Sequence, residues 1–282
     1  MTTMKNVTFN DVRQKCTDGR FFPYDHWLDR TFVPPAIVLT WVFVRLGISG
    51  NTVSWISGLF VIAGACGLAS NNSYIVVAGS FGYMAFYLLD YVDGSVARYN
   101  GTAGMSGQYV DWVIHIISSV STMAGLVAGA FLCTGAWIFP FGILALVAAA
   151  LTTGRFSMGW FAVCMERQQR QAKGSDLALA PTLVHSSRPL SRAFWAIRAG
   201  TTLLFHENYI IFSLPVLALS QLFVPDYIPD FRVVLVVLAG TFYFAVMILE
   251  IQRIASARGI EEAYRKLFID GAKPDLPNDH FF

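Results

Sequence analysis

Four ionisable side chains occur within or beside apolar stretches of the sequence, at spacings that suit metal chemistry. Asp90 and Asp93 are three residues apart, and Asp111 and His115 are four residues apart. Residues at these spacings share one face of a helix, so the members of each pair should point the same way. Three carboxylates in a site of low dielectric cannot all stay ionised without a cation. We therefore expect a divalent metal here, and oxygen ligands favour Mg²⁺ or Mn²⁺.

Small residues and an arginine accompany these acids. Gly94, Ala97 and Gly107 are small enough to let helices or a ligand approach closely. Arg98 follows Ala97 directly, and its planar guanidinium is suited to a phosphate group. Arg155 is a further basic residue in an apolar stretch, and it is expected either to hold a phosphate or to pair with one of the acids. The competing interpretation is structural, with Arg98 or Arg155 neutralising an Asp between helices.

The composition identifies the surroundings of these residues. The chain has 282 residues, of which 55% are hydrophobic and 13% are charged, and its mean hydropathy is +0.53. Soluble domains carry about 25% charged residues. The composition therefore predicts a protein that crosses a membrane several times, and it argues against a nucleic-acid partner. The net charge of +2 indicates no partner, and the four cysteines have no metal or redox spacing.

Stretches without Asp, Glu, Lys or Arg locate the membrane spans, each of which needs about 20 residues. The sequence predicts an all-α fold with six transmembrane helices, at about 51–70, 73–98, 107–134, 137–165, 208–225 and 233–249. Only a short turn, about 99–106, separates the second span from the third, so these two helices should be antiparallel neighbours. The acids of the second span and those of the third should then lie near the same face of the membrane.

A shorter apolar stretch, 31–44, opens with Pro34 and Pro35 and cannot cross the bilayer, so we expect a helix lying in the interface. The Lys and Arg residues concentrate before the first span, in the 166–206 connection and near the end of the chain. This distribution predicts that both termini are cytoplasmic. The predicted organisation is an N-terminal segment at 1–30, an interfacial helix at 31–47, a six-helix membrane domain at 48–255 and a tail at 256–282.

The acidic motif resembles that of the CDP-alcohol phosphotransferase family, D-x2-D-G-x2-A-R-x8-G-x3-D-x3-D. In this chain it runs from Asp90 to His115, seven of the eight fixed positions match, and every gap has the family length. The segment Gly50-Asn51-Thr52-Val53-Ser54 resembles a relaxed form of the Pro-Asn-x-x-Thr sequence that the family tends to carry at the start of its first span. Six spans, a preceding interfacial helix and cytoplasmic termini also fit the family.

The resemblance implies a reaction and a role for each motif residue. The donor is a CDP-linked alcohol, the hydroxyl of an acceptor alcohol attacks the β-phosphorus, and CMP leaves. Asp90, Asp93 and Asp111 would bind one or two Mg²⁺ or Mn²⁺ ions on the pyrophosphate. Substrate binding would fall to Asn51, Gly94, Ala97, Arg98, Gly107 and Arg155.

The implied substrates include one lipid-like molecule. The donor would be CDP-diacylglycerol or a soluble CDP-alcohol, in the synthesis of a phospholipid or a related head-group conjugate. The other partners implied are membrane lipids and a second copy of the chain, since the family suggests a homodimer. We expect the protein in a bacterial inner membrane.

His115 departs from the family pattern, which has a fourth Asp at this position. Three interpretations follow: His115 is the base that deprotonates the acceptor, it is a ligand to a softer metal such as Mn²⁺ or Zn²⁺, or the protein is a catalytically inactive homologue. A divalent-cation transporter that uses the same carboxylates is a further alternative. A transporter, however, should have polar groups along the whole depth of the membrane, and here they cluster near one face.

Overall fold

The structure, a computed structural model, is helical in the part of the chain that it describes. It describes residues 7–17, 27–151, 196–197, 200–201, 204–205, 207–224 and 229–256, and within these ranges there is no β-strand. This agrees with the all-α prediction. The described helices include α1 Phe9–Thr17, α2 Trp27–Arg45, α3 Gly50–Leu68, α4 Ser73–Tyr99, α5 Met105–Thr134, the 3₁₀ turn η1 Ala136–Ile138, α8 Glu207–Phe223, α9 Phe231–Leu238, the π-helical turn η2 Ala239–Tyr243 and α10 Phe244–Ser256. The chain is also helical at 139–151.

Four described helices are long and apolar enough to cross a membrane, which is consistent with an integral membrane protein. They are Gly50–Leu68, Ser73–Tyr99, Ser106–Thr134 and Phe231–Gln252. The predicted fifth span corresponds to α8, whose 17 residues rise about 26 Å, less than the roughly 30 Å hydrocarbon core of a bilayer. The predicted fourth span is described only as far as residue 151. Six spans therefore stay a prediction, and the predicted tail lies outside the described residues apart from Ser256.

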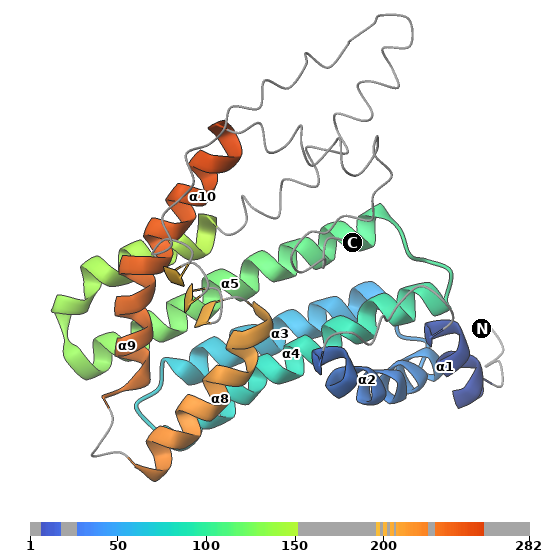
Figure 1. Ribbon diagram of the computed structural model, residues 1–282. Coiled ribbons are helices and arrows are strands. Elements are labelled where there is room, and N and C mark those ends of the chain that lie inside the picture. Colours follow the sequence, from blue (N-terminus) through green and yellow to red (C-terminus); the bar gives the residue numbers. More distant parts are fainter. Residues whose placement is uncertain are drawn as a thin grey trace, which may run out of the picture.

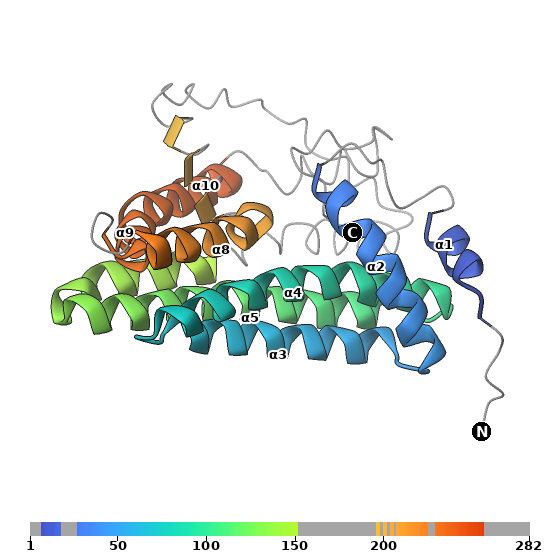
Figure 2. The same cartoon turned by 90° about the horizontal axis from the view of Figure 1, so that it is seen from below.

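Helices α3, α4 and α5 lie side by side through the centre of the molecule, and α4 runs antiparallel to the other two (Figures 1 and 2). Asn72 begins α4, because its side chain accepts hydrogen bonds from the N–H groups of Tyr74 and Ile75 at 2.9 and 3.4 Å. Gly101, in the turn from α4 to α5, has a φ of +69°, which glycine adopts without strain. We call the end of the bundle that holds this turn the motif end, and the opposite end the far end.

Glycines let α3 approach both α4 and α5 until the backbones touch. A Cβ atom on Gly67 would lie 2.6 Å from the Cα atom of Gly79, and a Cβ atom on Gly125 would lie 2.5 Å from the carbonyl oxygen of Ala65. Small residues allow this close packing in membranes, where van der Waals contact replaces the hydrophobic effect as the force between helices. The glycines thus hold α3 against the two helices that carry the acidic motif.

Helix α2 corrects the predicted start of the helix before the first span. It begins at Trp27, and Pro34 and Pro35 lie inside it rather than at its start. An interior proline removes a backbone hydrogen bond and ordinarily costs about 3 kcal/mol. Phe32 and Val33, just before the prolines, are buried with exposed fractions of 5% and 1%. This packing, which includes ring contacts to α4 and α8, holds a helical turn that the prolines alone disfavour. The interfacial position of α2 stays a prediction.

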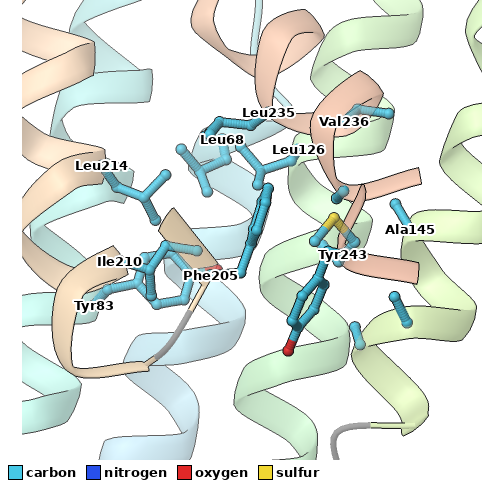
Figure 3. Packing of buried hydrophobic residues seen from close by; sticks show 14 of the residues in the cluster. Leu68, Tyr83, Leu126, Ala145, Phe205, Ile210, Leu214, Leu235, Val236 and Tyr243 are labelled. Carbon is cyan, nitrogen blue, oxygen red and sulfur yellow. The ribbon is translucent and has the colours of Figure 1, made fainter. Parts of the chain in front are cut away.

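The largest hydrophobic cluster joins the central helices to α8 and α9 (Figure 3). Leu68 of α3, Tyr83 of α4 and Leu126 of α5 are buried in it together with Leu214 of α8 and Leu235 of α9. Dispersion contacts of this kind are individually weak and collectively large. They fix the second group of helices on the bundle that positions the acids.

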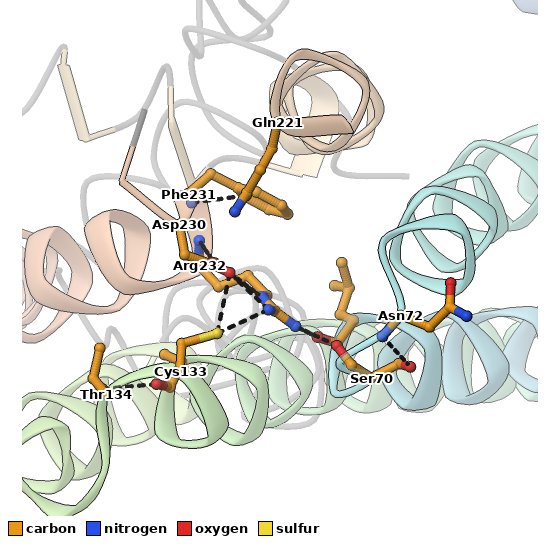
Figure 4. Close-up of polar contacts among 10 residues, drawn as sticks. Ser70, Asn72, Cys133, Thr134, Gln221, Asp230, Phe231 and Arg232 are labelled. Atoms are coloured by element: carbon orange, nitrogen blue, oxygen red, sulfur yellow. Dashed lines mark hydrogen bonds and ion pairs between the residues drawn. The ribbon is translucent and has the colours of Figure 1, made fainter. Parts of the chain in front are cut away.

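Arg232 ties the ends of three helices together at the far end (Figure 4). Its Nη1 atom donates to the carbonyl oxygen of Leu68, the last residue of α3, at 2.8 Å and to that of Ser70 at 2.6 Å. Its Nη2 atom donates to Asp230 Oδ2 at 2.7 Å and to Cys133 Sγ at 3.1 Å, the latter on α5. The guanidinium is buried, with 4% of the residue exposed. The sequence offered no such role for Arg232, because its partners are distant in the chain.

Replacing Gly79 by Ala should destabilise the protein, because the added methyl group would lie 2.7 Å from the Cα atom of Gly67. Overpacking of this kind costs about 1–3 kcal/mol. The matched control is Gly104→Ala, since a Cβ atom there would meet nothing within 4 Å. We expect Gly79→Ala to unfold in detergent at a lower temperature than the wild type and the control. Equal midpoints for all three proteins would contradict the close packing of α3 on α4.

The Asp230 carboxylate should make stability depend on pH. Burial acts to raise the pKa of Asp230, but the hydrogen bonds and charge of Arg232 outweigh it and lower the pKa below its ordinary value. Such a carboxylate contributes stability above its unfolded pKa, about 3.9, and that contribution is lost as the pH falls through the folded pKa. The difference in unfolding temperature between the wild type and Asp230→Asn should therefore be largest near neutral pH and shrink below about pH 4. A difference that does not change with pH would count against the pair.

Candidate metal centre

Asp90, Asp111 and His115 come together at the motif end. Asp90 lies in the last turns of α4, and Asp111 and His115 lie in the first turns of α5. The Nε2 atom of His115 is 3.2 Å from Oδ1 of Asp90 and 3.4 Å from Oδ1 of Asp111. One possible ligand atom from each residue lies within 4.8 Å of the other two. The three residues are thus close enough to bind one metal ion.

The short turn from α4 to α5 produces this meeting. Helix α4 ends at Tyr99, and α5 begins at Met105. The N–H group of Thr102 donates to the carbonyl oxygen of Ala97 at 2.8 Å, which closes the turn over the last residues of α4. With so few residues between them, the two helices must return antiparallel. Their adjoining turns therefore carry the motif residues to the same end of the bundle, as the sequence predicted.

The donor set fits a divalent cation. Two carboxylates that face one another repel unless a positive charge lies between them, and either a metal ion or a protonated imidazole supplies it. The side chains of Asp90, His115 and Asp111 are partly exposed, at 23%, 21% and 44%, so an ion can reach them. Two carboxylate oxygens and one imidazole nitrogen suit Mn²⁺ or Zn²⁺ better than Mg²⁺, which prefers oxygen ligands alone.

Asp93 is less exposed to solvent than the other two acids and has a different partner. It is 8% exposed, and Ser54 Oγ of α3 donates a hydrogen bond to its Oδ2 atom at 2.5 Å. It is close enough to Asp90 and Asp111 for their charges to act on it, but it is not one of the three residues whose ligand atoms converge. Its role as a metal ligand stays a prediction.

The start of α3 packs directly on the motif turn of α4. A Cβ atom on Gly50 would lie 2.7 Å from the carbonyl oxygen of Asp93 and 2.9 Å from Cβ of Ala97. Ala97 therefore contacts a helix, and its small size serves that packing. Asn51 comes next, and its Oδ1 atom lies 3.6 Å from the position of a Cβ atom on Gly107. The structure thus brings Asn51 and Gly107 together, as expected of two residues of one site.

Arg98 extends back along α4 toward the acids. A Cβ atom on Gly94 would lie 2.8 Å from Nη1 of Arg98 and 3.3 Å from its Cζ atom, so the guanidinium rests against the glycine. Its Nη2 atom donates a hydrogen bond to Ser95 Oγ at 3.2 Å. The absence of a side chain at Gly94 leaves the space that the guanidinium occupies. Arg155, the other predicted phosphate ligand, lies outside the described residues.

Two neighbours of the site had no role in the sequence analysis. Ser54, the last residue of the relaxed first-span motif, orients the Asp93 carboxylate. Phe86, which is fully buried, places its ring 5.8 Å from the His115 imidazole, nearly perpendicular to it at 76°. Phenylalanine in an apolar helix carries no sequence signal of this role, because its contact with His115 depends on how α4 packs on α5.

Comparison with models of known protein families and with curated proteins finds no match for this chain. The family assignment therefore rests on the motif residues, their spacing and their position in the structure.

Mn²⁺ affinity should depend strongly on Asp90 and Asp111. Loss of a residue that only supports a metal ligand costs about 10–100-fold in affinity, so Asp90→Asn and Asp111→Asn should each cost at least as much. Titration of the purified protein with Mn²⁺, followed by calorimetry or by the spin resonance of free Mn²⁺, measures this. Asp230→Asn, which removes a carboxylate at the far end, is the control and should bind normally. Unchanged affinity in Asp90→Asn would exclude the metal centre.

Proposed function

We propose that the chain is a membrane-embedded CDP-alcohol phosphotransferase. It transfers a substituted phosphate group from a CDP-linked alcohol to the hydroxyl of an acceptor and releases CMP. The observation that carries this proposal is the convergence of Asp90, Asp111 and His115 within ion-pair distance at one end of two antiparallel helices. These are the first and the last two acidic positions of the motif. Helices that only crossed the membrane would have no need to gather such costly groups.

Asp90 and Asp111 would hold the divalent cation, Mn²⁺ or Mg²⁺. Asp93 would be a third ligand, as the resemblance of the motif implies. Ser54, through its hydrogen bond to Oδ2, fixes the orientation of the Asp93 carboxylate. When bound, the cation would neutralise the pyrophosphate and stabilise the leaving oxygen. The two carboxylates lie 3.2 and 3.4 Å from the same imidazole nitrogen. This supports the assignment, because their oxygen atoms are close enough together to bind one ion.

His115 is the proton acceptor in this proposal. Neutral Nε2 takes the proton of the acceptor hydroxyl while that oxygen forms its bond to the β-phosphorus and the bond from this phosphorus to the oxygen of CMP breaks. The imidazolium that results lies beside Asp90 and Asp111, whose negative charges stabilise it. The edge contact with Phe86 limits rotation of the ring and keeps Nε2 directed at the site.

Arg98 binds the diphosphate of the donor. Its guanidinium rests on Gly94 on the same helix as Asp90 and Asp93, so it can approach a phosphate oxygen on the nucleotide side of the acids. Asn51 and Gly107 lie together at the start of α3 and the start of α5, where the cytidine would be accommodated. Gly107 leaves room for a ligand because, beyond its own helix, the Asn51 oxygen is the only described atom within 4 Å of its Cβ position.

The proposal includes the finer features that the sequence predicts. The chain would have six spans, with α2 in the interface and both termini in the cytoplasm, so the motif end would face the cytoplasm of a bacterial inner membrane. One substrate would be lipid-like, and the product would be a phospholipid or a related head-group conjugate. The enzyme would act as a homodimer.

Purified protein in lipid vesicles should release CMP from at least one member of a panel of CDP-alcohols, in the presence of Mn²⁺ and a membrane lipid extract. Asp90→Asn and Asp111→Asn should abolish release, and His115→Ala should slow it by about 10²–10⁴ because the general base is lost. Asp230→Asn is the control for a destabilised protein with an intact site, and it should retain turnover.

Three outcomes would contradict parts of this proposal. Full CMP release by Asp90→Asn would exclude the metal-dependent mechanism. His115→Ala that loses Mn²⁺ affinity together with activity would make His115 a ligand rather than the base. Flux of divalent cations through the vesicles, without CMP release from any donor, would show a transporter that uses the same carboxylates.

A further inference from the structure

The N-terminal segment contains a helix, α1, that docks beside the end of α4. Val12 and Cys16, one turn apart on α1, are buried with exposed fractions of 0% and 2%. Figure 2 shows α1 next to α2, at the end of the molecule where α4 ends and α5 begins. The sequence analysis assigned residues 1–30 only as an N-terminal segment and identified no helix in it. A nine-residue helix is too short to be stable alone in water, so its contacts must hold it in place.

Three contacts of different kinds fix α1 at this position. The indole Nε1 of Trp41 on α2 donates to the carbonyl oxygen of Val7 at 3.1 Å. The rings of Phe9 and Trp41 meet edge to face, with their centres 6.3 Å apart. The ammonium of Lys15 lies 4.5 Å from the centre of the Tyr99 ring, on the last residue of α4. Together they attach the start of α1 to α2 and the end of α1 to the last residue of α4.

Cys16 joins α1 to the arginine of the motif. Its thiol lies within hydrogen-bonding reach of Ser95 and close enough to Arg98 for their charges to interact. Burial raises the pKa of the Cys16 thiol, so the group is uncharged near neutral pH. Ser95 Oγ in turn donates to the carbonyl oxygen of Tyr91 at 2.8 Å and accepts from Arg98 Nη2 at 3.2 Å. Ser95 thus binds Arg98 and lies within reach of Cys16.

Arg98 therefore lies between its own helix and the position where α1 packs. The guanidinium rests against Gly94 and donates to Ser95 Oγ from Nη2, and the buried Cys16 of α1 is close enough for its charge to interact with Arg98. A free arginine side chain loses rotamer entropy when it binds a phosphate. Contacts that restrict it beforehand reduce this loss and so strengthen binding of the anion.

We propose that α1 forms a wall of the donor diphosphate site and that Cys16, through Ser95, is a positioning residue for Arg98. This inference rests on the proposed function, in which Arg98 binds the diphosphate. It assigns the N-terminal segment to the substrate site rather than to the membrane surface. The ligand concerned is the diphosphate of a CDP-linked donor, and the metal centre is expected to be unaffected by α1.

Undocking α1 should weaken CDP binding without changing Mn²⁺ binding. Val12→Asp places a charge in the buried face of α1, and Gln14→Asp, with the same change at an exposed position of the same helix, is the matched control. Calorimetry in the presence of Mn²⁺ should show CDP affinity about three- to tenfold lower in Val12→Asp and unchanged in Gln14→Asp. Mn²⁺ affinity should be the same in all three proteins.

Cys16 variants provide a milder test that does not depend on undocking the helix. Cys16→Ala removes the polar partner of Ser95, and Cys16→Ser restores one of similar size. For turnover, Cys16→Ala should raise the KM for the donor about threefold or more with kcat unchanged, and Cys16→Ser should recover much of the loss. A residue with only a structural role would instead lower the amount of folded enzyme and leave the KM as it was.

Labelling of Cys16 by a maleimide tests the docking separately from the function. In a protein with Cys66, Cys133 and Cys164 replaced by Ser, Cys16 is the one remaining thiol. It should react slowly in the folded protein, faster after Val12→Asp, and more slowly still with CDP and Mn²⁺ bound. Equally fast labelling of folded and denatured protein would overturn the docking.

The binding results separate the two proposals. A wild type that binds no CDP, with or without Mn²⁺, would overturn the proposed function and the role of Arg98 with it, even if Cys16 is protected. A wild type that binds CDP, with equal affinity in Val12→Asp and Cys16→Ala, would overturn only the role of α1.

Discussion

The repulsion between Asp90 and Asp111 is the constraint on which the arrangement of the motif end depends. Ionised carboxylates are costly in membrane-spanning helices, and two that face each other are more so. His115 stands between them at 3.2 and 3.4 Å, where it or a cation can offset the charge. The short turn between α4 and the antiparallel α5 brings the two carboxylates and the imidazole together. Asp93, which lies deeper, relies on a hydroxyl of α3 instead.

Helix α3 connects the scaffold to the site, although it carries none of the convergent residues. Gly67 brings it against α4 near the far end, and Gly50 brings it against the motif turn at the other. Because both contacts leave no space for a side chain, α3 cannot shift without separating the backbones. This rigidity places Ser54 beside Asp93 and Asn51 beside Gly107. The geometry of the site is therefore a consequence of backbone packing one helix away.

The two ends of the bundle use buried charge in different ways. At the far end, Arg232 has Asp230 as a counter-ion, and its remaining donors reach carbonyl oxygens and a thiol. Such a group is fully engaged and holds helix ends together. At the motif end, the three convergent side chains are partly exposed and face a common point. An ionisable residue in a membrane helix is thus a candidate for function only after its partners are known.

The sequence by itself determined the helices α3, α4 and α5 and the meeting of Asp90, Asp111 and His115. These depend on local information: apolar runs of sufficient length, a cap at Asn72, and spacings on one helix face followed by a short turn. The sequence also identified Arg98 as the arginine of the motif, but it did not predict which residues contact the guanidinium.

Only the tertiary structure decided which residues surround the site and where the flanking helices lie. Helix α2 continues in front of its prolines because Phe32 packs against rings of α4 and α8, which no periodicity reveals. Helix α1 lies in the N-terminal segment, where the sequence analysis identified no helix. Its few apolar residues gain their partners only in the folded chain. Ser54 and Cys16 gain their partners on α4 for the same reason. Their contacts join residues tens of positions apart, and such pairs are set by packing rather than by spacing.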